Sequence, residues 1–230
     1  MIRNRKGQTW PRFAVFFSGL LIMALGIVLL IKAELGATPW DVLHVGLFYQ
    51  AGLTIGSWSI IVGLVILTAA ALLSGEIPQF GAFLNMLLIG VFIDFYMMLP
   101  FMQTPGSLAG KIVMLGAGII INAYGMGLYI SAQFGAGPRD SLMIALAAKT
   151  GWKIRDVRGA MELLVLAAGW LLGGPIFWAT ILYTLVIGPL AGLALPQCQT
   201  LTDKWLEKLR SKKGGIGAPS LKEQDRGASS

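Results

Sequence analysis

The chain has 230 residues, of which 56% are hydrophobic and only 13% charged, and its mean hydropathy is +0.73. A soluble domain needs a charged surface, and this sequence has too few charged residues to cover one. The charges are also clustered, so that residues 13–31 and 112–121 contain none. Because a helix needs roughly 20 apolar residues to cross a ~30 Å hydrocarbon core, the composition predicts an integral membrane protein in a lipid bilayer.

Residue types that serve catalysis or metal binding are scarce. The only histidine is His44 and the only cysteine is Cys198, which argues against a histidine-rich metal site and excludes an internal disulfide. No phosphate-binding glycine loop, nucleophile elbow or zinc-protease motif occurs. We therefore expect no enzyme activity, no catalytic residues, no cofactor and no metal site. The net charge of +7 would suit nucleic acid, but membrane topology explains it better, so we expect no nucleic-acid partner.

The first half of the chain follows a basic cytoplasmic N-terminus, residues 1–12. Its first apolar segment is longer than the core of a signal peptide, so we expect a retained helix. A Gly-Ala-x-Pro turn and a short helix come next, and two further apolar helices close the unit. In chain order these elements are predicted at Phe13–Ile31, Gly36–Pro39, about Trp40–Gln50, Trp58–Ser74 and Phe80–Met98.

The sequence repeats itself at an offset of 99 residues. Glycine, proline and aspartate recur at matched positions, as in Gly36 and Gly135, Pro39 and Pro138, and Asp41 and Asp140. From residue 19 to residue 75 there are 21 identities in 57 positions, and shared apolar character cannot easily supply the glycine, proline and aspartate among them. Residues 13–98 and 112–195 are therefore predicted to be two copies of one three-span unit.

The second copy has the same order of elements, predicted at Ile112–Ile130, Gly135–Pro138, about Arg139–Lys149, Val157–Gly173 and Ile176–Leu195. A short helix of ~12 residues reaches only ~18 Å, so each short helix is expected to re-enter the membrane or to lie at its interface. After the second copy, residues 200–213 are interpreted as a basic interfacial helix and residues 214–230 as a disordered tail.

The distribution of basic residues predicts the orientation. With six spans and a cytoplasmic N-terminus, 16 of the 18 Lys and Arg residues fall on the cytoplasmic side, and both termini are cytoplasmic. An odd number of spans in each copy makes the copies face opposite ways, as in several transporter folds. The predicted fold is thus an all-α membrane protein of about six transmembrane helices in two inverted three-helix repeats, each with a short re-entrant or interfacial helix after a Gly-x-x-Pro-x-Asp turn.

The two Gly-x-x-Pro-x-Asp turns are the sharpest local signal. Proline suits the first turn of a helix, and Asp41 and Asp140 then lie where the helix dipole favours a carboxylate. One interpretation is that the turns are simply capped helix starts. The other is that two broken helices meet near the twofold axis, where a helix N-terminus can hold an anion and unwound carbonyls can hold a cation.

The turns differ where Trp40 in the first copy corresponds to Arg139 in the second. Arg139 could pair with Asp140 or bind an anionic group, or it could extend to the cytoplasmic surface without a binding role.

Polar side chains at membrane depth are the other candidates. Glu162 follows Arg158 by one helical turn, so it forms either a local ion pair or a proton or cation site. Asn85 and Asn122 could each line a pore or join helices, and joining helices is favoured for both. His44 could titrate near neutral pH but is interpreted as structural, and Asp94 is expected at the membrane interface. The candidate substrate-binding or ion-binding residues are therefore Trp40, Asp41, Asn122, Arg139, Asp140 and Glu162.

The order of motifs resembles one known family. Gly-Ala-x-Pro-Trp-Asp at 36–41 and Gly-Ala-Gly-Pro-Arg-Asp-Ser-Leu-Met at 135–143 are followed by Arg158 and Glu162. In this order the chain resembles the YczE/YitT-type bacterial membrane proteins up to about Leu195. The resemblance implies a multi-pass protein of the bacterial cytoplasmic membrane, without implying a defined activity or catalytic residues.

Two functions are compatible with these features. The first is a transporter of a small solute or ion that works by alternating access, with Asp41, Arg139 and Asp140 lining the site and Glu162 as a coupling group. The second is a non-transporting scaffold or an accessory or regulatory subunit of a partner membrane protein, and a homo-oligomer is also compatible. A polar cavity shared by both copies would favour transport, whereas a dry, glycine-packed interior would favour a scaffold.

Overall fold

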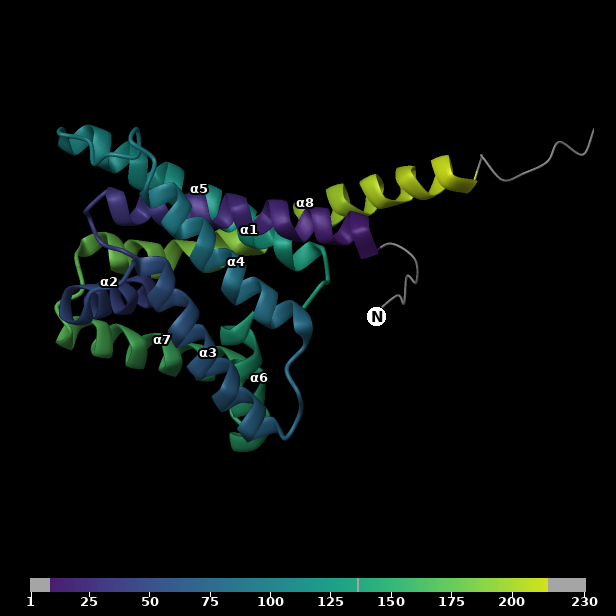
Figure 1. Ribbon diagram of the computed structural model, residues 1–230, viewed down its shortest axis with the longest axis horizontal. Coiled ribbons are helices and arrows are strands. Elements are labelled where there is room, and N and C mark those ends of the chain that lie inside the picture. Colours follow the sequence, from purple (N-terminus) through teal and green to yellow (C-terminus); the bar gives the residue numbers. More distant parts are fainter. Residues whose placement is uncertain (1–8, 136, 215–230) are drawn as a thin grey trace, which may run out of the picture.

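The protein is described here by a computed structural model that covers residues 9–135 and 137–214, with side chains up to residue 210. All regular structure in this part of the chain is helical, which confirms the predicted all-α class (Figure 1). The helices are α1 (Thr9–Lys32), α2 (Pro39–Ala51), α3 (Ile55–Ser74), α4 (Phe80–Met97), α5 (Leu108–Ser131), α6 (Pro138–Thr150), α7 (Ile154–Leu171) and α8 (Trp178–Gly214).

The helices and turns of the first half recur in the second. Helices α1 and α5 have 24 residues each, and α2 and α6 have 13 each. The turns between them also match, because Glu34 and Gln133 have left-handed φ angles of 53° and 52°. Gly36 and Gly135 follow with φ angles of 123° and 155°, which side chains rarely allow, so both turns require glycine at this point.

Five of the described helices, α1, α3, α4, α5 and α8, are long and apolar enough to cross a membrane. The expected sixth span is α7, which has 18 residues but carries two arginines and two acidic residues and does not meet the same criterion. Thus five helices, not six, qualify as candidate spans by length and composition. Helices α2 and α6 are too short to cross straight through, because 13 residues extend about 20 Å.

The C-terminal segment differs from the prediction. Residues 200–213 do not form a separate helix, because α8 continues without a break to Gly214 and extends beyond the rest of the bundle (Figure 1). Thr202 in this segment hydrogen-bonds Ser131 through their hydroxyl oxygens at 2.7 Å, which ties α8 to the end of α5. The predicted tail, residues 214–230, lies outside the described residues except for Gly214, as do residues 1–8 of the basic N-terminus.

Helices α1 and α5 cross with their backbones in contact. A Cβ atom on Gly26 would lie 2.5 Å from the backbone nitrogen of Asn122, and one on Gly125 would lie 2.6 Å from the Cα atom of Met23. Along the crossing, the facing residues are Gly19 and Tyr129, Met23 and Gly125, Gly26 and Asn122, and Leu30 and Gly118. Numbers rise on α1 as they fall on α5, so the helices are antiparallel. When each residue is replaced by its equivalent 99 positions away in the other half, every one of these four contacts becomes another of the four.

The other helices pack across the two halves. Helix α2 packs on α7 and α3 packs on α6, so each short helix lies against the third helix of the opposite half. The turn before α2 also crosses over, because the Leu35 carbonyl oxygen accepts a hydrogen bond from the Ala179 backbone N–H at 3.1 Å, at the start of α8. In the same way Gly135, before α6, packs against Gly81 at the start of α4.

One pair of helices breaks this correspondence. Helices α3 and α4 pack closely, with Gly56 against the Gly90 carbonyl oxygen and Gly63 against Met86. The corresponding helices α7 and α8 form no comparable contact in the described part of the chain. Gly159, Gly188 and Gly192 on these helices have open space where a Cβ atom would be. The second half therefore has a gap between α7 and α8, where the first half has a close contact between α3 and α4.

The α1–α5 crossing predicts the effect of adding one methyl group. Gly125→Ala should lower the free energy of unfolding by about 1–3 kcal/mol, because its Cβ atom would overlap the α1 backbone. Gly116→Ala is the matched control on the same helix, since its Cβ atom would meet open space, and it should not lower stability. Denaturant titration in lipid–detergent micelles measures both changes. Equal stabilities of the two variants would contradict the close contact between the α1 and α5 backbones.

Candidate functional site

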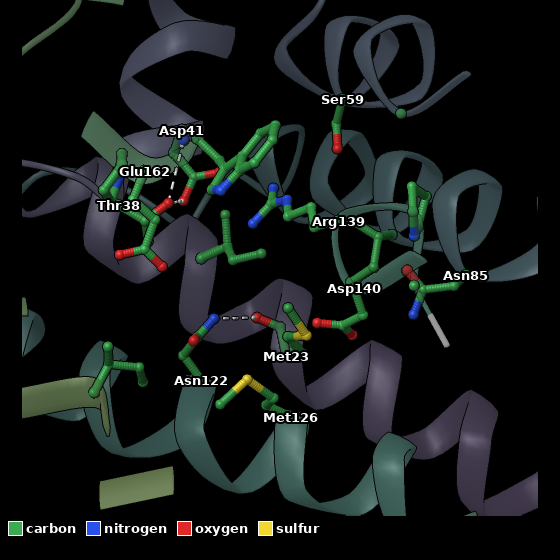
Figure 2. A pocket seen from close by; sticks show the side chains of 18 of the residues that line it. Met23, Thr38, Asp41, Ser59, Asn85, Asn122, Met126, Arg139, Asp140 and Glu162 are labelled. Atoms are coloured by element: carbon green, nitrogen blue, oxygen red, sulfur yellow. Dashed lines mark hydrogen bonds between the residues drawn. The ribbon is translucent and has the colours of Figure 1, made fainter. Parts of the chain in front are cut away.

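A cavity of about 340 Å³ lies where the first turns of α2 and α6 meet the long helices, and each of the eight described helices contributes to its lining. The six residues proposed from the sequence all line it, namely Trp40, Asp41, Asn122, Arg139, Asp140 and Glu162. All of these except Trp40 are labelled in Figure 2. The structure therefore brings together candidates that lie up to 122 positions apart in the sequence. Their role in binding stays a prediction.

The residues that distinguish the two turns contact each other. Trp40 and Arg139 hold the same position in the two halves, and the Arg139 Cζ atom lies 4.5 Å from the centre of the Trp40 ring. This is cation–π geometry. Figure 2 shows Arg139 reaching from α6 toward the side of the cavity that carries Thr38 and Asp41. The alternative in which Arg139 extends to the cytoplasmic surface therefore does not describe this structure.

Asp41 is held in the first turn of α2 by the helix cap. Thr38 accepts a hydrogen bond from the Asp41 backbone N–H at 3.2 Å, and its hydroxyl donates to Asp41 Oδ2 at 2.6 Å. The carboxyl group is buried, and its second oxygen, Oδ1, has no hydrogen-bond partner among the described residues. The cap explains why Asp41 lies at this position, but it leaves half of the carboxylate unsatisfied.

Asp140 holds the corresponding position in α6 with different partners. Gly137 replaces Thr38 in the second half, so α6 has no side-chain cap. Asp140 Oδ2 instead accepts a hydrogen bond from the Tyr129 hydroxyl at 3.4 Å, which comes from α5. The two carboxylates are therefore equivalent in sequence but not in environment.

Asn122 joins helices and also lines the cavity. Its Nδ2 atom donates to the Met23 carbonyl oxygen at 3.5 Å, at the α1–α5 crossing. Its Oδ1 atom accepts a hydrogen bond from the Tyr183 hydroxyl at 3.0 Å, which comes from α8.

Glu162 forms the local ion pair that the sequence suggests. Arg158 Nε donates to Glu162 Oε1 at 3.0 Å, and both side chains also line the cavity. The Arg158 side chain is 52% exposed, compared with 24% for Glu162. The pair therefore lies at the open edge of the cavity, near the start of α7.

The structure shows that Asp94 caps a neighbouring helix. Its oxygens Oδ1 and Oδ2 accept hydrogen bonds from the Gly56 backbone N–H at 2.8 Å and the Thr54 hydroxyl at 2.5 Å. Asp94 on α4 therefore caps the start of α3 and does not line the cavity, so it has a structural role beyond a place at the interface.

Several cavity residues were missed or given another role by the sequence analysis. His44, which the sequence suggests is structural, is buried and lines the cavity. Tyr129 and Tyr183 were missed, because a single tyrosine in an apolar segment forms no pattern. The repeat could have indicated Tyr183, which aligns with the cavity residue Asn85 at an offset of 98 residues. Five methionines also line the cavity: Met23, Met86, Met126, Met143 and Met161.

Most charged groups of the cavity come from the second half. Three pairs of corresponding positions differ in this way: Trp40 and Arg139, Ser59 and Arg158, and Gly63 and Glu162. Only the aspartates of the two turns are shared. Three carboxylates and two guanidinium groups thus line one cavity, with apolar and thioether side chains between them. Such a site can orient a small polar molecule through charge and hydrogen bonds while the apolar wall excludes water.

The chain matches a family described as "Family of unknown function (DUF6198)" over residues 10–196. It is 46% identical over 188 residues to "Uncharacterized membrane protein YczE" of Bacillus subtilis (strain 168), covering 81% of this chain and 86% of that protein. "Uncharacterized protein YyaS" of the same organism is 28% identical over 186 residues, covering 80% and 92%. No solved structure matches significantly. The resemblance to YczE-type membrane proteins is confirmed.

The contact between Trp40 and Arg139 predicts non-additive stabilities. In a cycle of Trp40→Leu, Arg139→Gln and the double variant, we expect a coupling energy of about 0.5–2 kcal/mol, because each single change already removes the cation–π contact. Free energies of unfolding in lipid–detergent micelles measure it. Arg139→Lys, made once with Trp40 present and once together with Trp40→Leu, is the control that keeps the positive charge. Additive effects would show that the two side chains do not interact.

Proposed function

The chain belongs to the family of unknown function DUF6198, and we propose that it is a transporter that moves a small solute or ion across the bacterial cytoplasmic membrane by alternating access. The observation that carries the proposal is a cavity lined by both halves of the chain in which three carboxylates and two guanidinium groups gather. Each charged group inside a bilayer costs free energy, and a scaffold or accessory subunit gives no functional reason to gather several of them there.

The symmetric contacts support an inverted repeat. Because α1 and α5 hold equivalent positions and run antiparallel, the two halves pass through the bilayer in opposite directions. In this proposal α7 completes the sixth span. Its charged residues Arg158 and Glu162 face the cavity, while Leu163 and Leu164 are about 70% exposed and face lipid. Charged side chains are tolerated at membrane depth in that arrangement.

The short helices supply the centre of the site. In the proposed topology, α2 and α6 enter the membrane from opposite sides, and their first turns meet at the cavity. Broken helices of this kind place N–H groups and carbonyl oxygens within reach of a solute in the middle of the bilayer. The close backbone packing of Gly36 and Gly135 against α8 and α4 supports a fixed position for both turns.

The difference between the halves provides the two states that alternating access needs. With both termini in the cytoplasm, the gap between α7 and α8 lies on the cytoplasmic side, next to Arg158 and Glu162. The corresponding α3–α4 contact closes the other side. In the opposite state, α7 and α8 close and α3 and α4 separate. The open faces at Gly188 and Gly192 already allow the closer approach.

A cysteine-accessibility experiment tests the proposal without knowledge of the solute. The Cys198→Ala variant contains no cysteine and serves as the background. Val62→Cys and Met161→Cys then place single thiols at corresponding positions of the cavity on α3 and α7. We expect a charged, membrane-impermeant thiol reagent to label both positions from either side of the membrane, because the cavity opens to each side in turn.

Val65→Cys on the same background is the control. Val65 is 64% exposed on α3 and does not line the cavity, so its thiol should lie in lipid and resist the charged reagent. Labelling of the two cavity positions from one side only, or from neither, would favour the scaffold.

Uptake measurements test the site itself. Comparing metabolites in cells with and without the protein identifies a candidate solute, and proteoliposomes then measure its flux. Asp140→Asn and Glu162→Gln should each reduce uptake, because each removes a charge from the cavity while keeping the side-chain volume. Glu76→Gln, in the exposed loop before α4, is the control and should leave uptake unchanged. Unchanged flux in both cavity variants would exclude this site.

A further inference from the structure

Two buried side-chain atoms on α2, one from Asp41 and one from His44, face each other without a hydrogen-bond partner among the described residues. Asp41 Oδ1 and His44 Nδ1 lie 3.6 Å apart, and neither atom has a hydrogen-bond partner among the described residues. Both residues are 1% exposed. Buried polar atoms normally have partners, because leaving them unpaired costs free energy. A bound group that satisfies both atoms at once would remove this cost.

We propose that Asp41 and His44 together bind one proton, which drives transport through the cavity. A neutral imidazole can donate to Asp41 Oδ1 only in the tautomer that carries its hydrogen on Nδ1. The imidazolium always carries that hydrogen and adds the attraction of its charge to the carboxylate, so protonation favours the contact between the two atoms. The pair changes from a net charge of −1 to zero. That the proton drives transport rests on the proposed function, whereas the proton site itself does not depend on that function.

A metal ion is a weaker candidate for the same place. Among residues 9–135 and 137–214, no group of three or more His, Cys, Asp or Glu side chains could hold a metal. A proton requires no further ligand, and histidine is the side chain whose ordinary pKa lies nearest neutrality.

Arg139 links this proton site to the rest of the cavity. Its guanidinium stacks on Trp40, the residue before Asp41, and reaches toward Asp41 (Figure 2). When the pair is unprotonated, Arg139 is the nearby cation that balances the Asp41 carboxylate. When the proton binds, the imidazolium takes over this role, and Arg139 becomes free to attract an anionic group of a solute. The proton and Arg139 thus compete for Asp41.

Other charges near the pair come from several helices. Helix α7, which packs on α2, contributes an ion pair, and α3 contributes no titratable group to the cavity lining. The remaining titratable residues of the cavity are Tyr129, Arg139, Asp140, Arg158, Glu162 and Tyr183. Arg158 and Glu162 largely neutralise each other, so Asp41 and Arg139 should have the largest opposite effects on the proton.

His44 offers a direct test because it is the only histidine in the chain. The full-length protein, labelled with ¹⁵N-histidine and purified with a histidine-free tag, is placed in lipid nanodiscs. NMR signals of the ring nitrogens are then followed from about pH 4 to about pH 9, the range in which histidine normally titrates. We expect one transition, in which both ring nitrogens become protonated.

Three variants make the test specific. Asp41→Asn should shift the transition to lower pH by about 1–3 units, because it removes the carboxylate that favours the imidazolium. Arg139→Gln should shift it to higher pH, whereas Arg139→Lys should leave it close to that of the unsubstituted protein. Asp156→Asn, on the exposed first turn of α7, makes the same chemical change outside the cavity and should cause no shift.

The outcomes are distinct. A His44 ring that does not titrate in this range, or a transition that Asp41→Asn leaves in place, overturns the proton site. If Asp41→Asn fails to fold, the shift to higher pH expected for Arg139→Gln and the unchanged transition expected for Arg139→Lys still decide the question. Since no solute is needed, a negative result here leaves the transport proposal intact. Conversely, cysteine labelling from one side only would overturn the transport proposal but not the proton site.

Discussion

The structure depends on the direct contact of two helix backbones, α1 and α5. Gly26 and Gly125 permit an approach that any larger residue would prevent, and the antiparallel crossing sets the axis that relates the two halves. Helices α4 and α8 pack on α1 and α5 respectively, and the turns that follow α1 and α5 start the short helices. The positions of Asp41 and Asp140 relative to one another therefore follow from this crossing.

Much of this arrangement could be predicted because the sequence contains the same unit twice. Repeated Gly-x-x-Pro-x-Asp turns predicted α2 and α6 to within one or two residues, since proline and glycine restrict the backbone locally. The six candidate residues reached one cavity because charged groups in apolar segments have few other places to go. Local rules and the scarcity of polar residues were sufficient for these predictions.

The features that were missed depend on contacts between the halves. No local pattern says that α2 packs on α7, and without that contact the burial of His44 in the cavity wall cannot be seen. The helix cap that Asp94 forms could not be predicted for a related reason, because its partner, the start of α3, lies about forty residues earlier in the chain. The sequence does not show that α8 continues through residues 200–213, because the basic residues there are typical of a separate interfacial helix, whereas the backbone stays helical without a break.

The stacked pair of Trp40 and Arg139 bears on the origin of the fold. A homodimer of identical three-span units places identical side chains opposite each other wherever the symmetry axis passes between equivalent positions. Two arginines there would repel each other, and two tryptophans would lack the cation. A guanidinium can meet an indole at this point only when the two subunits are encoded as unlike sequences. In this chain the two equivalent positions are encoded separately, so they can differ, and that difference is what allows the contact between Trp40 and Arg139.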